Sequence, residues 1–374
     1  MKITIITPRF AISGVPLAQI RFARAWSARG HDVRLIIGKV EAGYEIPSVP
    51  GVVVDHLNKS KVRDMLVPLV RHLRKEKPDI LFSAEDHLNA MVLIAALLSR
   101  SKVKTSGSSR VLPTDRLAYS DKPLTKGWML KNVMRALMWR ADALTCVSKD
   151  MVGMYQKMFR KAPHVCVYNI IKDEASLAKA KEPVEHPWLS AKSIPVVISA
   201  GTFTRRKGFA DLINAFAIAQ ASTPMRLIIL GDGYLMGELT TLVRELGIED
   251  RVSLPGNVLN PLKYFSRADV FVLSSYAEGM PNVLVEAMMC GCTPVATDCP
   301  TGPRELLDNG EIGFLVPMGD VARMADAIVK AVQAPTSPAV LAKAVMPFED
   351  SAVLDSHLRV LGLRDKYVSS VTEQ

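Results

Sequence analysis

The sequence predicts an α/β fold made of two doubly wound units, each with a parallel sheet covered by helices on both faces. Short apolar runs typical of buried strands alternate along the chain with segments whose apolar residues recur at helical spacing. The alternation stops over residues 171–193 and then begins again. A chain of 374 residues is also longer than one hydrophobic core usually supports, so we expect two domains.

The first unit is expected over residues 1–170 and the second over 194–350, with 171–193 as a linker. Residues 351–374 are expected to form a helix that packs back on the first unit. Units of this kind that face each other enclose a cleft, and ligands bind at the carboxyl ends of the strands. The expected strands are 3–7, 33–37, 52–54, 80–82, 144–147 and 165–168, then 196–199, 227–230, 252–254, 270–273, 293–296 and 314–316. The expected helices are 16–29, 61–76, 88–100 and 124–141, then 208–220, 236–246, 281–290 and 320–333.

Composition indicates an ordinary globular protein, with 49% hydrophobic and 22% charged residues. The sequence has no run of eighteen apolar residues, and its first residues lack the pattern of a secretory signal. The five cysteines are scattered, without a His or fourth Cys at a metal-binding spacing, so we interpret them as small buried residues. We therefore expect a protein of the reducing cytoplasm.

Charge is unevenly distributed along the chain. Residues 1–170 contain 28 basic and 13 acidic side chains and carry +15, whereas the rest of the chain carries −5. The basic first half favours an anionic partner, which could be nucleic acid, a phospholipid surface or an acceptor linked to pyrophosphate.

The most informative segment is 278–286, Glu-Gly-Met-Pro-Asn-Val-Leu-Val-Glu, which follows the apolar run 270–273. This order predicts a strand, a tight loop and a helix, with Pro281 near the helix start where a missing N–H costs nothing. Free amides at that start favour a phosphate. Glu278 on the loop and Glu286 about two turns into the helix would both face one ligand. Carboxylates beside an anion site suit the hydroxyls of a sugar and a ribose. Two solvated surface charges are the alternative.

A basic loop follows another expected strand of the second unit. Residues 201–208, GTFTRRKG, place Arg205, Arg206 and Lys207 where they could neutralise a diphosphate or form a solvated basic turn. The carboxyl ends of parallel strands share one edge of a sheet, so this loop and 278–286 should open on the same site. Four more residues follow strands in this way and could line a site or belong to ordinary turns: Gly14, Gly231, Asn257 and Val258.

From about residue 196 to 333 the sequence resembles the donor half of the family 4 retaining glycosyltransferases, which have the GT-B fold of two facing Rossmann-like domains. The first half resembles the family more weakly, through its opening strand, Gly14 and the turn at 29–33. The matching motifs of the second half stand in the family's order and spacing: Lys207-Gly208, Gly231-Asp232-Gly233, Gly256, Glu278…Glu286, EAMMCGCTPVATDCPTGPREL at 286–306 and GFLVP at 313–317.

The resemblance implies a role for each matching residue. Glu278 would hold hydroxyls of the donor sugar, Glu286 the ribose and Lys207 the diphosphate. The family usually has an Arg directly after the Gly of the first loop, where this chain has Thr202, so Arg205 or Arg206 must substitute. Many members also have a His after the strand near 103–105, and His87 is the nearest replacement here. Backbone amides would contribute from Gly279, Met280, Asn282, Val283 and Leu284.

The sequence contains no Asp-x-Asp pair, the usual carboxylate clamp for a divalent ion on a nucleotide sugar, so we expect neither a metal nor another cofactor. Lys207, the arginines and the helix start would then stabilise the charge of the leaving group. Retention in this family is commonly assigned to front-face attack, in which the leaving phosphate takes the acceptor proton. We therefore expect Glu278, Lys207 and Arg206 to carry catalysis without a protein nucleophile.

Segment 122–140 has apolar residues on one helical face and cations elsewhere. This pattern fits an interfacial membrane helix and also a core helix of the first unit. Together with the basic first half, it is compatible with peripheral docking on the cytoplasmic face of an anionic membrane.

The expected activity is transfer of a hexose or N-acetylhexosamine from a UDP-linked sugar to a glycan or lipid-linked acceptor, in polysaccharide or lipopolysaccharide biosynthesis. A nucleotide-sugar epimerase of the same fold is one alternative. A basic nucleic-acid-binding protein is less favoured, because the sequence lacks aromatic interleaving and any recognised nucleic-acid module. Nucleic acid is therefore not expected among the partners.

Overall fold

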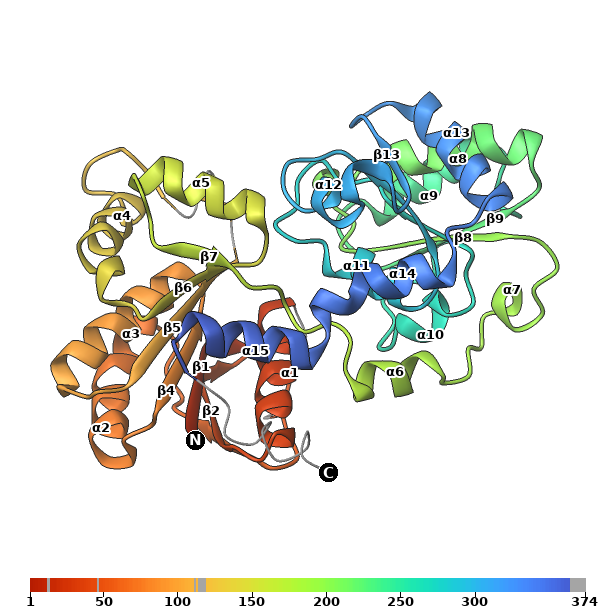
Figure 1. The fold of residues 1–374 in the computed structure, drawn as a ribbon. Helices are drawn as coiled ribbons and strands as arrows, with labels where there is room; N and C mark the ends of the chain where they lie inside the picture. The colour runs from red at the N-terminus through yellow and green to blue at the C-terminus, as the bar shows by residue number, and fades with distance from the viewer. Residues whose placement is uncertain (12–13, 46, 111, 114–118, 364–374) are drawn as a thin grey trace. The chain divides into compact units, whose positions relative to one another are not determined.

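The computed structural model describes all of the chain except residues 12–13, 46, 111, 114–118 and 364–374 (Figure 1). It contains two compact units. The first comprises Met1–Ile170 together with the chain from Asp350 onward, and the second comprises Ile171–Glu349. Each unit has a parallel sheet with helices on both faces, so the predicted α/β fold class is confirmed.

The first unit has a seven-stranded sheet in the order β3-β2-β1-β4-β5-β6-β7. Its strands are β1 (Lys2–Phe10), β2 (Asp32–Val40), β3 (Val52–His56), β4 (Ile80–Ala84), β5 (Lys104–Ser109), β6 (Ala143–Cys146) and β7 (His164–Cys166). Its α-helices are α1 (Gly14–Ala28), α2 (Leu66–Glu76), α3 (Asp86–Ser99), α4 (Lys126–Leu137), α5 (Lys149–Phe159) and α15 (Asp350–Val360), with 3₁₀ turns η1 (Val62–Met65) and η2 (Met138–Arg140).

The second unit has a six-stranded sheet in the order β10-β9-β8-β11-β12-β13. Its strands are β8 (Val196–Ala200), β9 (Arg226–Leu230), β10 (Val252–Ser253), β11 (Val270–Leu273), β12 (Thr293–Thr297) and β13 (Phe314–Val316). The helices are α6 (Glu174–Ala180), α7 (Pro187–Ser190), α8 (Phe209–Ser222), α9 (Met236–Glu245), α10 (Leu262–Phe265), α11 (Asn282–Met289), α12 (Pro303–Leu306), α13 (Val321–Gln333) and α14 (Pro338–Val345). Three 3₁₀ turns complete it: η3 (Arg205–Lys207), η4 (Asp308–Gly310) and η5 (Met346–Phe348).

The two faces of the first sheet bury alternate residues of its strands, as side chains of a strand point to opposite faces. Ile3 and Ile5 of β1 belong to the core beneath α1 and α15, whereas Ile6 belongs to the core beneath α2 and α3. The last helix joins this unit through Val353, Leu354 and Leu358 in the first of these cores. Arg29 also pairs with Asp355 of α15 at 2.6 Å.

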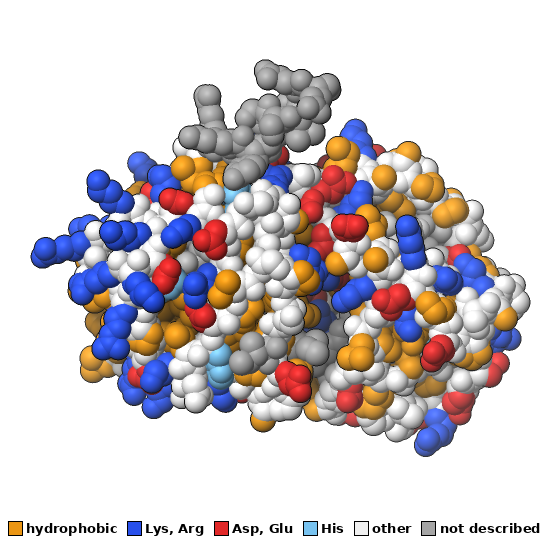
Figure 2. Space-filling view, turned by 90° about the horizontal axis from the view of Figure 1, so that it is seen from below, with side chains coloured by type: hydrophobic (Ala, Val, Ile, Leu, Met, Phe, Trp, Pro, Cys, Tyr) orange, Lys and Arg blue, Asp and Glu red, His pale blue; other side chains and the backbone are white. Residues whose placement is uncertain are grey.

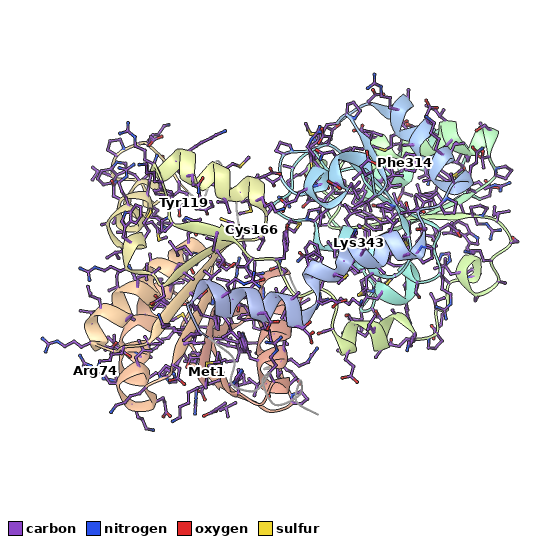
Figure 3. All side chains as sticks on the ribbon, in the orientation of Figure 1. Met1, Arg74, Tyr119, Cys166, Phe314 and Lys343 are labelled. Carbon is purple, nitrogen blue, oxygen red and sulfur yellow. The ribbon has the colours of Figure 1, made fainter. Side chains whose placement is uncertain are left out.

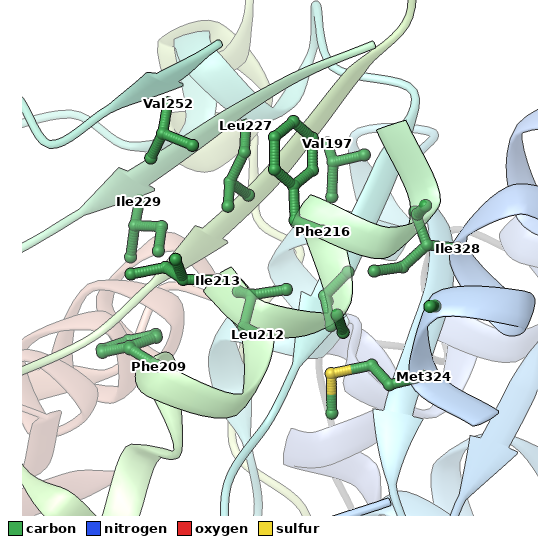
Figure 4. Close-up of a cluster of buried hydrophobic side chains, with 14 of the residues drawn as sticks. Val197, Phe209, Leu212, Ile213, Phe216, Leu227, Ile229, Val252, Met324 and Ile328 are labelled. Atoms are coloured by element: carbon green, nitrogen blue, oxygen red, sulfur yellow. The ribbon is translucent and has the colours of Figure 1, made fainter. Parts of the chain in front are cut away.

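In the second unit, α8 and α13 cover one face of the sheet. Phe216 of α8 is fully buried against Val197 and Leu227, and Ile328 of α13 lies on the same cluster (Figure 4). Strands β11 and β12 are buried along their whole length, which explains why β11 is a continuous apolar run in the sequence rather than an alternating one.

Strand β5 (KTSGSS) was not among the strands expected from apolar runs, because it has none of the apolar residues of a buried strand. The family resemblance implied a strand near 103–105, and the observed strand extends to Ser109. It is nevertheless buried, since α3 lies directly on it: a Cβ on Gly107 would stand 2.8 Å from Asn89 Cγ. Asn89 also donates to the Ser108 carbonyl and accepts from Ser83. Small side chains are therefore needed here for close packing and for hydrogen bonds to a buried amide.

Residues 171–193, which we expected as a linker, contain α6 and α7 and belong to the second unit. Asp173 caps α6 by accepting from the Ser176 backbone N–H at 2.7 Å. His186 caps α7 in the same way through the Trp188 N–H. The two short helices were not predicted because the segment is charged and rich in Pro. N-capping hydrogen bonds stabilise them.

Candidate active site

An ion pair between Lys207 and Glu278 forms the centre of the candidate site in the second unit. Lys207 Nζ donates to Glu278 Oε1 at 2.6 Å, and Ser275 Oγ donates to the same oxygen at 2.6 Å. The two side chains are 15% and 9% exposed, so the pair is largely shielded from water yet still reachable at one edge. The structure thus joins the two loops that the sequence placed at one sheet edge.

Gly208 allows Lys207 to reach this position. Its φ of +63° is in the left-handed region, and a Cβ there would stand 2.1 Å from the Ser274 carbonyl oxygen. Ser274 Oγ in turn donates to the Lys207 carbonyl at 2.8 Å, and the Tyr276 N–H donates to the Arg206 carbonyl at 2.8 Å. The 201–208 loop therefore lies backbone to backbone on the loop that follows β11.

The loop after β12 holds Glu278 from the other side. Thr301 Oγ1 donates to the Glu278 carbonyl, and Thr301 itself has a φ of +64°. Gly302 follows with a φ of +95°, and a Cβ there would stand 2.5 Å from Pro281 Cδ. Two consecutive residues in the left-handed region thus clamp the segment that leads into α11.

Helix α11 begins at Asn282, directly after Pro281, close to the start at 281 that the sequence predicted. Leu284 is fully buried, and its N–H donates to the Pro281 carbonyl at 2.9 Å. Glu286 lies in the second turn and is half-buried. The Asn282 N–H donates to the Met280 carbonyl at 2.9 Å. The short Gly279–Pro281 connection links this helix start to Glu278, and the positive end of the helix dipole favours an anion there.

The remaining glycine loops of the second unit meet at the same edge. The Gly231 N–H donates to the Gly256 carbonyl at 2.9 Å, and the Gly201 N–H donates to the Leu230 carbonyl at 3.0 Å. A Cβ on Gly231 would stand 2.0 Å from the Gly201 carbonyl oxygen. Asn257 and Val258 follow Gly256 directly, exposed and half-buried respectively.

Other predicted residues lie at varying depth. Arg205 and Arg206 are exposed on η3. Met280 is buried, whereas Gly279 and Val283 are half-buried. Gly14 and His87 belong to the first unit, at the starts of α1 and α3. His87 is exposed, with Nε2 3.5 Å from Glu85 Oε2.

Ser275 and the pair of Tyr276 with Asp211 were not predicted as site residues from the sequence. Ser275 shares Glu278 with Lys207, and the Tyr276 hydroxyl donates to Asp211 of α8. The pattern Ser-Ser-Tyr directly after the β11 strand was the available signal, because small hydroxyl residues at the end of a buried strand often satisfy neighbouring loops.

The first unit has a buried polar cluster at the carboxyl ends of its strands, which was also missed. Asp86 at the start of α3 accepts from Ser109 of β5 and from Tyr155 of α5. Tyr155 stacks on His164 of β7 at a centroid distance of 4.3 Å. Tyr119 packs edge-on against Tyr155, beneath α5 (Figure 3). Burial lowers the pKa of His164 to about 4, although Asp86 opposes this shift.

The five cysteines are free thiols, and Cys292 donates to the Phe265 carbonyl at 3.1 Å. Burial raises the pKa of Cys290 to about 12 and that of Cys299 to about 11, which suits small core residues. Within the described residues there is no group of three or more His, Cys, Asp and Glu placed to hold a metal ion. None of the helices described has the length and apolar character needed to span a bilayer.

Comparisons with known proteins match both halves of the chain. The family described as Glycosyltransferase Family 4 matches residues 12–174, and the one described as Glycosyl transferases group 1 matches residues 194–334. The crystal structure of HepE from Anabaena in complex with UDP has a TM-score of 0.74 and 19% identity, covering 97% of this chain and all of that one. This likeness shows that the fold is GT-B.

Two curated relatives carry enzyme names. One is N-acetylgalactosamine-N,N'-diacetylbacillosaminyl-diphospho-undecaprenol 4-alpha-N-acetylgalactosaminyltransferase of Campylobacter jejuni, 36% identical over 47% of this chain and 47% of the relative. The other is the lipopolysaccharide core biosynthesis glycosyltransferase LpsE of Rhizobium meliloti, 28% identical over 82% of this chain and 83% of the relative. The chain thus spans about half the length of the first of these relatives.

The buried His164 predicts acid destabilisation. Its pKa falls from 6.5 to about 4 on folding, so its contribution is complete above pH 6.5 and is lost as the pH falls toward 4. The free energy of unfolding of the wild type should fall as the pH is lowered from 7 to 4.5. In His164→Gln this fall should be smaller by roughly 2–3 kcal/mol, measured by urea denaturation at both pH values. His87→Gln, at an exposed position, is the control and should follow the wild type. Equal pH dependence in all three proteins would contradict this assignment.

Proposed function

The chain belongs to the family 4 glycosyltransferases, and we propose that it transfers a hexose or N-acetylhexosamine with retention from a UDP-linked sugar to a glycan or lipid-linked acceptor. The pathway would be synthesis of cell-surface polysaccharide or lipopolysaccharide. The names of the relatives support this: one acts on a diphospho-undecaprenol-linked saccharide and the other in lipopolysaccharide core biosynthesis. The UDP complex of HepE supports the choice of nucleotide.

The contact between Lys207 and Glu278 is the observation that carries the proposal. A cation and a carboxylate 2.6 Å apart can both serve one ligand only if that ligand has an anionic group directly beside hydroxyl groups. A sugar 1-phosphate has this arrangement, since the phosphate is attached to the ring that carries the hydroxyls. Hydroxyl groups of the sugar would donate to the Glu278 carboxylate, and the diphosphate would accept from the Lys207 ammonium group.

The proposed chemistry uses fixed charges and dipoles. Charge develops on the leaving diphosphate, and Lys207, the exposed arginines 205 and 206 and the first amides of α11 would stabilise it. We propose that these groups make a divalent ion unnecessary. The acceptor oxygen would attack from the face that the diphosphate leaves, and the diphosphate would take its proton.

The alternatives receive no comparable support. The relatives named above are glycosyltransferases, which favours neither a nucleotide-sugar epimerase nor a nucleic-acid-binding protein. The proposed partners are therefore a nucleotide sugar and a glycan or lipid-linked acceptor, with no nucleic acid among them.

Removal of the donor-site charges tests the proposal. Lys207→Ala should lower kcat about 10²- to 10³-fold, as loss of one preorganised donor does. Glu286→Ala should weaken UDP binding by about 10- to 100-fold, because a hydrogen bond to a charged group is lost. Turnover of UDP-sugars and calorimetric UDP titrations measure these effects. The matched controls Lys330→Ala and Glu245→Ala, both exposed on helices of the same unit, should behave as the wild type. Full activity in Lys207→Ala and Glu286→Ala would refute the assignment.

We also propose that the first unit docks on an anionic membrane through the face of α4 and η2. This face exposes Met129 to 56% and Trp139 to 62%, beside the exposed Lys126, Arg135 and Arg140. Of the predicted helix, only Met134 and Met138 are buried, so the segment is neither a pure core helix nor fully solvated. Lys and Arg side chains also gather on another face of this unit, which is seen from below in the left half of Figure 2, so the positive charge of the unit is not confined to α4.

Vesicle sedimentation tests this docking face. The double variant Arg135→Gln/Arg140→Gln should bind vesicles of phosphatidylglycerol and phosphatidylethanolamine roughly 30-fold more weakly, at about 1 kcal/mol per cation. Trp139→Ser should weaken binding without changing its salt dependence. Arg244→Gln/Arg251→Gln in the second unit is the charge-matched control. Unchanged sedimentation of the α4 variants would contradict the docking face and leave the transferase proposal intact.

A further inference from the structure

A small cavity in the first unit is lined by residues whose buried polar atoms have no hydrogen-bond partner. Its volume is about 20 Å³, and it lies between α1, the end of β5 and α15. Gln19 Oε1, Arg110 Nε and His357 Nδ1 are buried without a hydrogen-bond partner, and all three residues line this cavity. Gln19 is 2% exposed and His357 7% exposed. Buried polar atoms are rarely left unpaired, so three around one space indicate an occupant.

The charge of Arg110 indicates what that occupant is. Arg110 Nη1 donates to Asn169 Oδ1 at 2.6 Å, which is a neutral acceptor. Among the described residues that line the cavity there is no Asp or Glu, and the carboxylate of Glu85 acts on Arg110 through its charge. Burial lowers the pKa of Arg110 to about 10, and the group still remains a cation near neutral pH. A buried cation that is hydrogen-bonded to a neutral amide is costly, and a bound anion reduces that cost.

We propose that this cavity binds one small monovalent inorganic anion of the size of chloride. Arg110 Nε–H donates to the anion from the position directly after β5, and the Nδ1–H tautomer of His357 donates from α15. Turning the Gln19 amide by 180° brings its NH₂ group into the cavity as the third donor, since the oxygen and nitrogen of an amide are interchangeable in such an assignment. A volume of about 20 Å³ admits a single water-sized species and excludes phosphate or a carboxylic acid.

The site would fasten the last helix to the first unit. His357 is held between Phe22 and Phe82, with ring centroids 4.8 and 5.3 Å away, so its position is fixed before the anion binds. Gln19, Arg110 and His357 come from three elements far apart in the sequence. One anion among them joins α15 to α1 and β5. This role is structural and independent of the proposed transferase activity.

Two measurements test the anion site in the full-length protein. Crystals grown in sodium bromide should show an anomalous bromide peak within hydrogen-bond distance of Arg110 Nε. Replacing sodium gluconate with sodium chloride at equal ionic strength should raise Tm by about 3–5 °C at roughly ten times the dissociation constant. Arg110→Gln should lose both the peak and the chloride-dependent rise, whereas the control Arg244→Gln on α9 should keep them.

If Arg110→Gln fails to fold, Gln19→Leu serves instead, because it removes one proposed donor and leaves the cation in place. A reduced chloride-dependent rise in Gln19→Leu supports the site. Ordered water at the cavity without a bromide peak would overturn the proposal. A chloride-dependent rise that persists in Arg110→Gln and in Gln19→Leu would overturn it as well.

Discussion

The contact of Gly208 with the Ser274 carbonyl is the constraint on which the site of the second unit depends. With a Cβ at residue 208 only 2.1 Å from that oxygen, no other residue allows the two loops to lie so close. The approach brings Lys207 from the β8 side to Glu278 on the β11 side, and Ser275 shares the carboxylate. The Thr301–Gly302 turn then fixes the other side of the Glu278 loop. The backbone therefore determines where Lys207 and Glu278 meet, through Gly208, Ser274, Thr301 and Gly302.

This arrangement is a preorganised one. The Lys207–Glu278 pair is largely shielded, so its attraction is stronger than that of a surface pair, and its loops leave little freedom for rearrangement. A ligand that takes over both charges replaces the ion pair with two complementary contacts. A ligand that satisfies only one would leave the other charge half-buried and unpaired, which is costly. The ion pair thereby favours a ligand with both a phosphate and hydroxyls over either group alone.

Much of this fold could be predicted from the sequence, because the buried parallel strands are uninterrupted apolar runs. The observed β11 (Val270–Leu273) and β13 (Phe314–Val316) coincide with the predicted ranges. Strand β5 could not be found in this way, since its burial depends on the close approach of α3 rather than on apolar side chains. Helices α6 and α7 were missed because local caps, not an apolar face, define them.

The sequence predicted those parts of the candidate site that directly follow a parallel strand, because such loops share one edge of the sheet. Loops after β8 and β11 had to share an edge, and the structure brings Lys207 and Glu278 together there. Ser275 and the clamp at Thr301 depend on hydrogen bonds across loops, which no spacing in the sequence reveals. The buried Arg110 could not be found in this way either, because an Nε without a hydrogen-bond partner becomes visible only when the neighbours of the side chain are known.

The central claim is that the second unit binds the diphosphate of a nucleotide sugar through Lys207 and the first amides of α11 without a metal. A crystal structure of the protein with a UDP-sugar in the presence of EDTA tests it most directly. The account predicts diphosphate oxygens within hydrogen-bond distance of Lys207 Nζ and of the amides at the start of α11, with sugar hydroxyls on Glu278. A nucleotide bound away from these residues, or bound only after magnesium is added, would contradict it.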